Sequence, residues 1–399
     1  MKFFTPILLT LVLTACGGGG GGGSSATSSP TANTSASHSL SVVLNYSSTA
    51  TSYNSAVGDL NGDGLEDVVI GSWSINAQQS RIFVFVQNID GTMSDHTQQY
   101  LGTTTIQGSQ HVFIADFDGD GRNDILIPGF ADGNTMPSVS TYIFWNNSNQ
   151  QFIQQTVAQT MAHGACVGDL NADGKLDFMA AGFNGGGAFI NNGNRSFTLN
   201  TTLLNGNTYF SACAIEQNTD GTISIAYGNH GIPGHTQGNL ITSDTGFNLV
   251  SIADIIDYPA GDLIDMVAID MNLDGKTDFV AIYNAPMGSL AKRDVLLNNG
   301  DDTFTYSQTL DNLGNDYCAY PTSVNGQPAI YFSGNATGNR IYTITNTAIT
   351  AYKPSAFTDM ATLVSGSNQA QAGVPYHGAG GNLYMLQFLN LSTFYTEAM

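Results

Sequence analysis

The chain has 399 residues, and its 31 Asp and Glu residues outnumber its 10 Lys and Arg residues, which gives a formal net charge of −21. This charge argues against nucleic acid and anionic lipid surfaces as partners, because both are themselves negatively charged. The 46 Gly residues and a charged fraction of only 10% are typical of a turn-rich β protein.

Residues 1–15 are predicted to be a lipoprotein signal peptide. Lys2 precedes an apolar stretch from Phe3 to Leu13, and Leu13-Thr14-Ala15-Cys16 resembles the lipobox at which bacterial lipoproteins are cleaved and acylated on the Cys. Gly17 stands where an Asp would favour inner-membrane retention. We therefore expect export through the Sec pathway, lipidation of Cys16 and an outer-membrane or cell-surface location, with an ordinary secretory signal as the alternative.

Residues 16–38 are predicted to be a flexible tether that begins at the lipidated Cys. From Gly17 to His38 the chain consists almost throughout of Gly, Ser, Thr, Ala and Pro, so this segment cannot bury a core. No second linker follows, and residues 39–399 are expected to form one domain.

Four copies of one acidic loop recur along this domain, at residues 59–67, 116–124, 169–177 and 270–278. Side-chain oxygens at positions 1, 3, 5 and 9, a Gly at position 6 and a backbone carbonyl at position 7 suit Ca²⁺. We therefore expect about four Ca²⁺ ions. The predicted ligands are Asp59, Asn61, Asp63, Leu65 and Asp67; Asp116, Asp118, Asp120, Arg122 and Asp124; Asp169, Asn171, Asp173, Lys175 and Asp177; and Asp270, Asn272, Asp274, Lys276 and Asp278.

The residues after each loop exclude an EF-hand. An EF-hand needs Glu at position 12 and flanking helices, but position 12 is Ile70, Ile127, Ala180 or Ala281. Each loop instead runs into an apolar, β-prone stretch such as Val68–Ile70, which indicates a buried strand. The repeating unit is therefore a strand, a calcium loop and a second strand.

Three degenerate copies extend the repeat. They lie at Glu216–Gly221, Val324–Gly326 and Gly380–Gly381, each before an apolar stretch, and calcium binding there is left open. A period near 50 residues is typical of a four-stranded propeller blade. We expect an all-β, seven-bladed β-propeller with calcium-binding loops between the first two strands of the blades. Leu40–Tyr46 is expected to complete the last blade.

The loops, together with the Gly and aromatic residues that follow the second strands, resemble FG-GAP or VCBS repeats, the calcium-binding blades of integrin α-subunit heads and of many bacterial surface proteins. The segments after the second strands are Gly71-Ser72-Trp73, Gly129-Phe130, Gly182-Phe183 and Tyr283-Asn284-Ala285-Pro286. The resemblance covers about residues 40–399 and implies the fold and calcium. It does not imply one function, because such blades occur in adhesins, lectins and accessory parts of enzymes.

Three cysteines occupy equivalent places, each three residues before the first position of its loop: Cys166, Cys213 and Cys318. Buried Cys commonly acts as a small hydrophobe, and we expect core thiols. A Cys166–Cys213 disulfide between neighbouring blades remains the alternative.

The face opposite the calcium loops is expected to carry the ligand, because loops on a rigid scaffold carry function. Aromatic rings beside imidazoles suit a sugar or a peptide, although many of these residues could simply belong to the core or to turns, which is the expectation for any single one. The candidates are Tyr53, Trp73, His111, Phe130, His163, Phe183, His230, Tyr283 and Tyr317. A transition-metal site among the histidines lacks a supporting motif.

Catalytic motifs are scarce. The sequence has no Gly-x-Ser-x-Gly, His-Glu-x-x-His or phosphate loop, and Asp262, Asp265 and Asp316 are acids without an obvious partner. We therefore expect that the protein is not an enzyme. We expect a surface-anchored, calcium-stabilised binding module that acts in adhesion or nutrient capture, and whose ligand is either a glycan or a protein of the envelope or of a host. The alternatives are a polysaccharide lyase or hydrolase, or a structural subunit of an envelope assembly.

Overall fold

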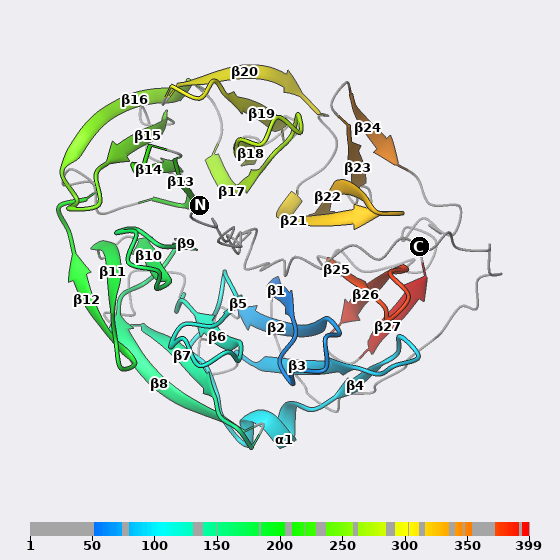
Figure 1. Ribbon diagram of the computed structural model, residues 1–399. Helices are drawn as coiled ribbons and strands as arrows, with labels where there is room; N and C mark the ends of the chain where they lie inside the picture. Colours follow the sequence, from blue (N-terminus) through cyan, green and yellow to red (C-terminus); the bar gives the residue numbers. More distant parts are fainter. Residues whose placement is uncertain are drawn as a thin grey trace, which may run out of the picture.

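The computed structural model describes most of the chain from residue 52 to residue 398 (Figure 1). The described ranges are 52–73, 80–130, 139–149, 151–182, 185–203, 210–218, 220–228, 237–257, 262–284, 292–301, 303–310, 316–334, 340–345, 348–352, 372–390 and 393–398. The predicted signal peptide, tether and first strand, Leu40–Tyr46, lie outside these ranges and remain predictions.

The described chain folds into antiparallel sheets of consecutive strands, numbered here 1 to 7 along the sequence. Sheets 1 to 3 are β1 (Ser52–Gly58), β2 (Asp67–Trp73), β3 (Ile82–Gln87) and β4 (Met93–Asp95); β5 (Phe113–Ala115), β6 (Asp124–Ile127), β7 (Ser140–Asn146) and β8 (Phe152–Gln159); and β9 (Gly164–Gly168), β10 (Asp177–Gly182), β11 (Gly185–Gly193) and β12 (Ser196–Asn200).

The remaining sheets follow the same order. Sheets 4 to 7 are β13 (Ala212–Gln217), β14 (Ile223–Gly228), β15 (Gln237–Ser243) and β16 (Leu249–Asp257); β17 (Asp262–Ile269), β18 (Asp278–Asn284), β19 (Lys292–Asn298) and β20 (Phe304–Thr309); β21 (Asp316–Val324), β22 (Gln327–Gly334), β23 (Arg340–Ile344) and β24 (Ile349–Tyr352); and β25 (Ala372–His377), β26 (Leu383–Asn390) and β27 (Thr393–Ala398).

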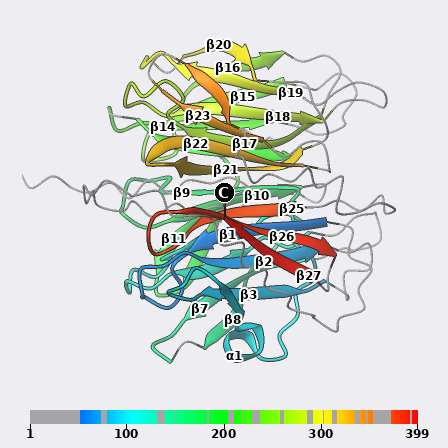
Figure 2. The ribbon, with the colours of Figure 1, turned by 90° about the vertical axis from the view of Figure 1, so that its right-hand side faces the viewer.

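The sheets stand around a common centre, so the protein is an all-β propeller, as the repeats predict. The first strand of each sheet lies nearest the centre and the last described strand lies at the rim (Figure 1). Seen from the side, the strands run roughly along the axis of the ring (Figure 2). Each loop between a first and a second strand therefore opens on one end of the ring.

The expectation of seven complete blades needs correction. The described residues form six four-stranded blades, and the three-stranded sheet 7 lies between sheets 6 and 1 (Figure 1). The strand expected to complete this sheet, Leu40–Tyr46, belongs to the part of the chain outside the description.

A single short helix accompanies the strands in the described ranges. Helix α1 (Thr97–Leu101) follows β4 at the rim and buries Tyr100 and Leu101. No helix among the described residues is long and apolar enough to cross a membrane.

The core consists of apolar layers between neighbouring sheets. Because successive strand residues point to opposite faces, each blade buries one set against the blade before it and one against the blade after it. Val69 and Val84 of sheet 1 pack with Ile125 of sheet 2, for example. Close packing also explains Gly228, where a Cβ would lie 2.2 Å from the Leu263 side chain of the next sheet.

A disulfide joins Cys166 of β9 to Cys213 of β13, so the expectation of core thiols at these two positions is wrong. The two residues hold equivalent places on neighbouring inner strands, which brings their Cα atoms to 5.7 Å. This separation lies within the range that a disulfide requires. The side chain of Cys318 is outside the description.

Candidate functional site

The four acidic loops all connect the first strand of a blade to its second. They join β1 to β2, β5 to β6, β9 to β10 and β17 to β18. The inner strands of the ring run in the same direction, so these loops gather on one end of the propeller. The structure thus confirms the position that the sequence predicts for the loops.

Carboxylates within each loop hold its backbone in a tight turn. In the loop at residues 59–67, the two oxygens of Asp59 accept the N–H groups of Gly62 and Gly64 at 2.6 and 2.8 Å. The Asp63 carboxylate accepts the N–H of Leu65 at 2.8 Å. Gly64 has a φ of +81°, and the Gly at position 6 of the other three loops also has a positive φ. Position 6 therefore needs Gly for its backbone conformation.

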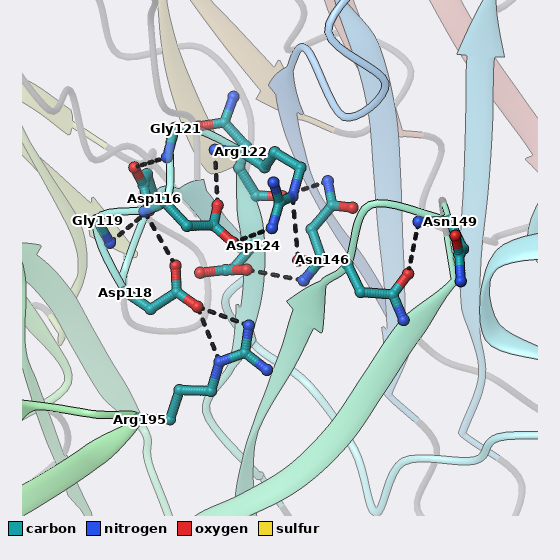
Figure 3. Close-up of polar contacts among 12 residues, drawn as sticks. Asp116, Asp118, Gly119, Gly121, Arg122, Asp124, Asn146, Asn149 and Arg195 are labelled. Atoms are coloured by element: carbon teal, nitrogen blue, oxygen red, sulfur yellow. Dashed lines mark hydrogen bonds and ion pairs between the residues drawn. The ribbon is translucent and has the colours of Figure 1, made fainter.

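The loop at residues 116–124 brings three carboxylates together. One oxygen from each of Asp116, Asp118 and Asp120 lies within 4.8 Å of the other two. Asp116 and Asp118 can be followed in Figure 3. Hard carboxylate oxygens at this spacing are a donor set that fits Ca²⁺. Three of the five predicted ligands of this loop are thus brought to one place.

The Asp at position 9 has a structural role that the sequence did not reveal. Asp124 is fully buried, and its carboxylate accepts the N–H of Phe117, at loop position 2, and the N–H of Asn146, at the end of β7, at 3.0 and 2.8 Å. Asp67, Asp177 and Asp278 accept the equivalent pairs of N–H groups. Each of these carboxylates therefore ties its loop to the third strand of the same blade.

Burial makes the charged form of these four carboxylates unfavourable. Desolvation, with a smaller contribution from the other loop carboxylates, raises the pKa of Asp124 to about 8, although two backbone N–H groups oppose the shift. The same causes raise the pKa of Asp67 and Asp177 to about 7 and that of Asp278 to about 6. A bound cation would offset this cost.

A side-chain amide at the end of the third strand links each loop to the preceding blade. The Asn146 amide donates to the carbonyls of Asn123, in its own loop, and Leu60, in the loop of sheet 1, at 3.0 and 2.8 Å. Asn191 repeats this pattern between sheets 3 and 2. The sequence signal was an amide that recurs 14–22 residues after each ninth-position Asp, at Gln87, Asn146, Asn191 and Asn298.

Basic side chains contact three of the loops. Arg122, Lys175 and Lys276, all at position 7, pair with the position-5 carboxylates Asp120, Asp173 and Asp274. The first loop has Leu65 at this position. Arg195, from the hairpin between β11 and β12, also contacts Asp118 (Figure 3).

The candidate ligand residues on the opposite end are mostly buried where their side chains are described. His111, Phe130 and Tyr283 are 2–4% exposed, and only His163 is half-buried. His111 and His163 come together, because a His111 ring nitrogen lies 3.2 Å from the His163 carbonyl. Buried side chains cannot contact a ligand in this conformation. The side chains of Tyr53, Trp73, Phe183, His230 and Tyr317 lie outside the description.

Among the uncommitted acids, Asp265 has a described side chain. It is 3% exposed, and one oxygen has no hydrogen-bond partner among the described residues. The side chains of Asp262 and Asp316 lie outside the description.

Comparisons with known proteins agree with this architecture. The BP39L lectin from Burkholderia pseudomallei superposes with a TM-score of 0.51 at 12% identity, over 87% of this chain and 98% of the lectin. A protein from Lactobacillus plantarum superposes with a TM-score of 0.50 at 10% identity, over 84% of this chain and 99% of that protein. Similarity at this level shows the fold alone. The sequence matches no curated protein.

The fold and the recurring acidic loops define a repeat-built β-propeller. Residues 59–127 match the family model of the FG-GAP-like repeat. The protein is therefore a β-propeller that carries FG-GAP-like repeats.

Proposed function

We propose that this protein is a calcium-stabilised binding propeller for a carbohydrate ligand, anchored to the outer membrane or cell surface through Cys16. The observation that carries the calcium part is the convergence of Asp116, Asp118 and Asp120 in one loop. The carbohydrate part is supported by the shared fold with a lectin. If the carbohydrate test is negative, the ligand that we propose is instead a protein of the envelope or of a host.

Calcium would be held by the side chains at loop positions 1, 3, 5 and 9 and by the carbonyl at position 7. The donor set consists of carboxylate, amide and carbonyl oxygens, the ligand types that Ca²⁺ prefers. A bound Ca²⁺ supplies positive charge where burial and mutual repulsion disfavour the ionised carboxylates. The three-stranded sheet 7 would serve as a seventh blade, completed by Leu40–Tyr46.

Thermal melting of the full chain with calcium and with EDTA tests the calcium part. We expect chelation to lower the melting temperature, because it leaves the loop carboxylates to repel one another. The variant Asp116→Asn should reduce this difference, whereas Asp301→Asn should preserve it, because Asp301 is exposed and its hydrogen bonds within the described ranges go to Thr303 of its own turn. An unchanged melt in EDTA would refute calcium stabilisation.

A glycan array, probed with calcium and with EDTA, tests the carbohydrate part. Selective binding that calcium strengthens is the expected result. Folded protein that binds no glycan in either condition would redirect the search to a protein ligand, by pull-down from native membranes. Release of shortened products from a bound polysaccharide would instead indicate an enzyme.

A further inference from the structure

The loop at residues 116–124 differs from the other three in the side chain at position 3. Position 3 is Asp118 here, whereas it is Asn61, Asn171 and Asn272 in the other loops. The loop thus contains four aspartates, and the others contain three each. An extra carboxylate among three others is unfavourable unless a positive charge lies beside it.

Arg195 provides this positive charge from the neighbouring blade. Its Nε and one terminal nitrogen lie 2.8 and 2.7 Å from the same oxygen of Asp118 (Figure 3). The Asp118 side chain is only 9% exposed, and that of Arg195 is 34% exposed. A charge-assisted contact of this kind is stronger and more directional than one between neutral groups.

The surroundings of Arg195 hold its guanidinium at this place. Asn194 and Arg195 form the two-residue turn between β11 and β12, with φ values of +53° and +58°. The guanidinium lies 5.0 Å above the Trp145 ring, and Gln155 donates to the Arg195 carbonyl at 3.1 Å. Gln155 also accepts the indole N–H of Trp145 at 2.8 Å. Arg195 is therefore fixed by its backbone as well as by its stacking.

The repeat supplies an internal comparison. The corresponding hairpins of sheets 2, 4 and 6, at residues 147–151, 244–248 and 345–348, contain no Lys or Arg. They follow the three loops that have Asn at position 3. An Arg in the hairpin thus occurs together with Asp at position 3. The formal charge of the four aspartates together with Arg122 and Arg195 equals that of three aspartates together with one Lys. Three aspartates and one Lys are the arrangement of the loops at 169–177 and 270–278.

We propose that Arg195 acts as a fixed cation of the loop at residues 116–124, which stabilises the loop without calcium and lowers its calcium affinity. This inference rests on the proposed binding of calcium by the loops. Arg195 neutralises part of the charge on Asp118, so a Ca²⁺ ion at this loop meets a weaker field than four carboxylates alone would produce. Arg195 also joins sheet 3 to the loop of sheet 2 whether or not calcium is bound.

Terbium luminescence provides a readout of this one loop. Tb³⁺ occupies oxygen-rich calcium sites, and its emission is sensitised by a nearby indole. Trp145 lies beside Arg195 and immediately before Asn146, which bonds Asp124. The only other Trp in the chain, Trp73, ends β2, about 20 Å of strand away from the loop at 59–67. Emission excited through Trp, absent in Trp145→Phe, therefore reports the loop at 116–124.

The test is a Tb³⁺ titration of the full chain followed by displacement with calcium. We expect Arg195→Gln to bind about five-fold more tightly, because removal of a partly screened charge beside the ligands strengthens their field. The same variant should melt at a lower temperature in EDTA. Arg195→Lys should stay within about two-fold of the natural protein, because it keeps the charge.

The double variant Arg195→Gln with Asp118→Asn recreates the position-3 Asn of the other loops and removes the Arg. It should fold, and its affinity should return to within about two-fold of the natural protein, because the formal charge of the loop is restored. Weaker or unchanged binding by Arg195→Gln would overturn the inference, since it would make Arg195 a structural support only. Absence of calcium-displaceable emission from the natural protein would overturn calcium binding at this loop and this inference with it, whereas the melt with and without EDTA tests calcium binding by the protein as a whole.

Discussion

The buried carboxylate of Asp265 makes the stability of the propeller depend on pH. Asp265 lies on the inner strand β17 next to a register shift, opposite Ile282 of β18. One of its oxygens accepts the N–H of Met266 at 2.9 Å, and the other has no partner among the described residues. Burial raises its pKa from 3.8 to about 7, although backbone N–H groups oppose the shift.

The direction of the effect follows from this shift. The folded protein holds the proton of Asp265 more tightly than the unfolded chain does, so the free energy of unfolding falls as pH rises from about 4 to about 7. With the raised pKa of about 7, the loss between about pH 5 and about pH 8 amounts to roughly 2–3 kcal/mol. Asp265→Asn has nearly the same shape and does not titrate, so it removes this loss.

The assay is urea unfolding of both proteins at several pH values in one buffer series. The difference in unfolding free energy between Asp265→Asn and the natural protein should move in favour of the variant as pH rises. Asp220→Asn is the control, because Asp220 is exposed and the hydroxyl and N–H of Thr222 lower its pKa. A difference in unfolding free energy that stays constant with pH would refute the inference that the Asp265 carboxyl is neutral in the folded state.

Three further results follow from the described contacts. Asn146→Ala should cost about 2 kcal/mol, because two carbonyls lose their donor, whereas Ala at the exposed Asn149 should cost little; urea unfolding measures both. Reduction of the Cys166–Cys213 disulfide, which spans 47 residues, should lower the stability by at most about 4 kcal/mol, and a melt with and without reductant tests this. Burial lowers the pKa of His111 to about 4, so the contribution of His111 to stability should fall by about 2 kcal/mol between about pH 7 and about pH 5. In a pH series of urea unfolding, the difference in unfolding free energy between His111→Asn and the natural protein should therefore move in favour of the variant as pH falls, and a difference that does not change with pH would contradict this.

The sequence was informative where one repeat could be compared with another. The acidic loops and the strands that flank them are predicted correctly, because Gly64 and its equivalents recur at a position that only a positive φ explains. The partners of a side chain in another blade carry no local signal. The pairing of Arg195 with Asp118 joins residues 77 positions apart, and the burial of Asp265 depends on how neighbouring inner strands approach each other.

The cysteines also show that a contact between two blades leaves no local signal in the sequence. Their equivalent places on the inner strands were read correctly, but burial alone does not decide between a thiol and a disulfide. That decision depends on the 5.7 Å between the Cα atoms of Cys166 and Cys213, which lie on neighbouring inner strands. Two of the candidate ligand residues, Phe130 and Tyr283, illustrate a related limit, because an aromatic residue near a strand end can equally be buried between blades, as both are here.

The loop at residues 59–67 lies at the seam where the two ends of the described chain meet. The Glu66 carboxylate accepts the N–H of His377 at 2.6 Å, and the Gln87 amide donates to the carbonyls of Glu66 and His377 at 2.8 and 2.9 Å. Sheet 7 is thus fastened to sheet 1 through the same loop that is proposed to bind calcium. Nearer the axis, the Tyr320 hydroxyl joins sheet 6 to Ser55 of sheet 1 at 2.8 Å. Order in this loop therefore supports the closure of the whole ring, whereas the other loops each support the contact between two adjacent blades.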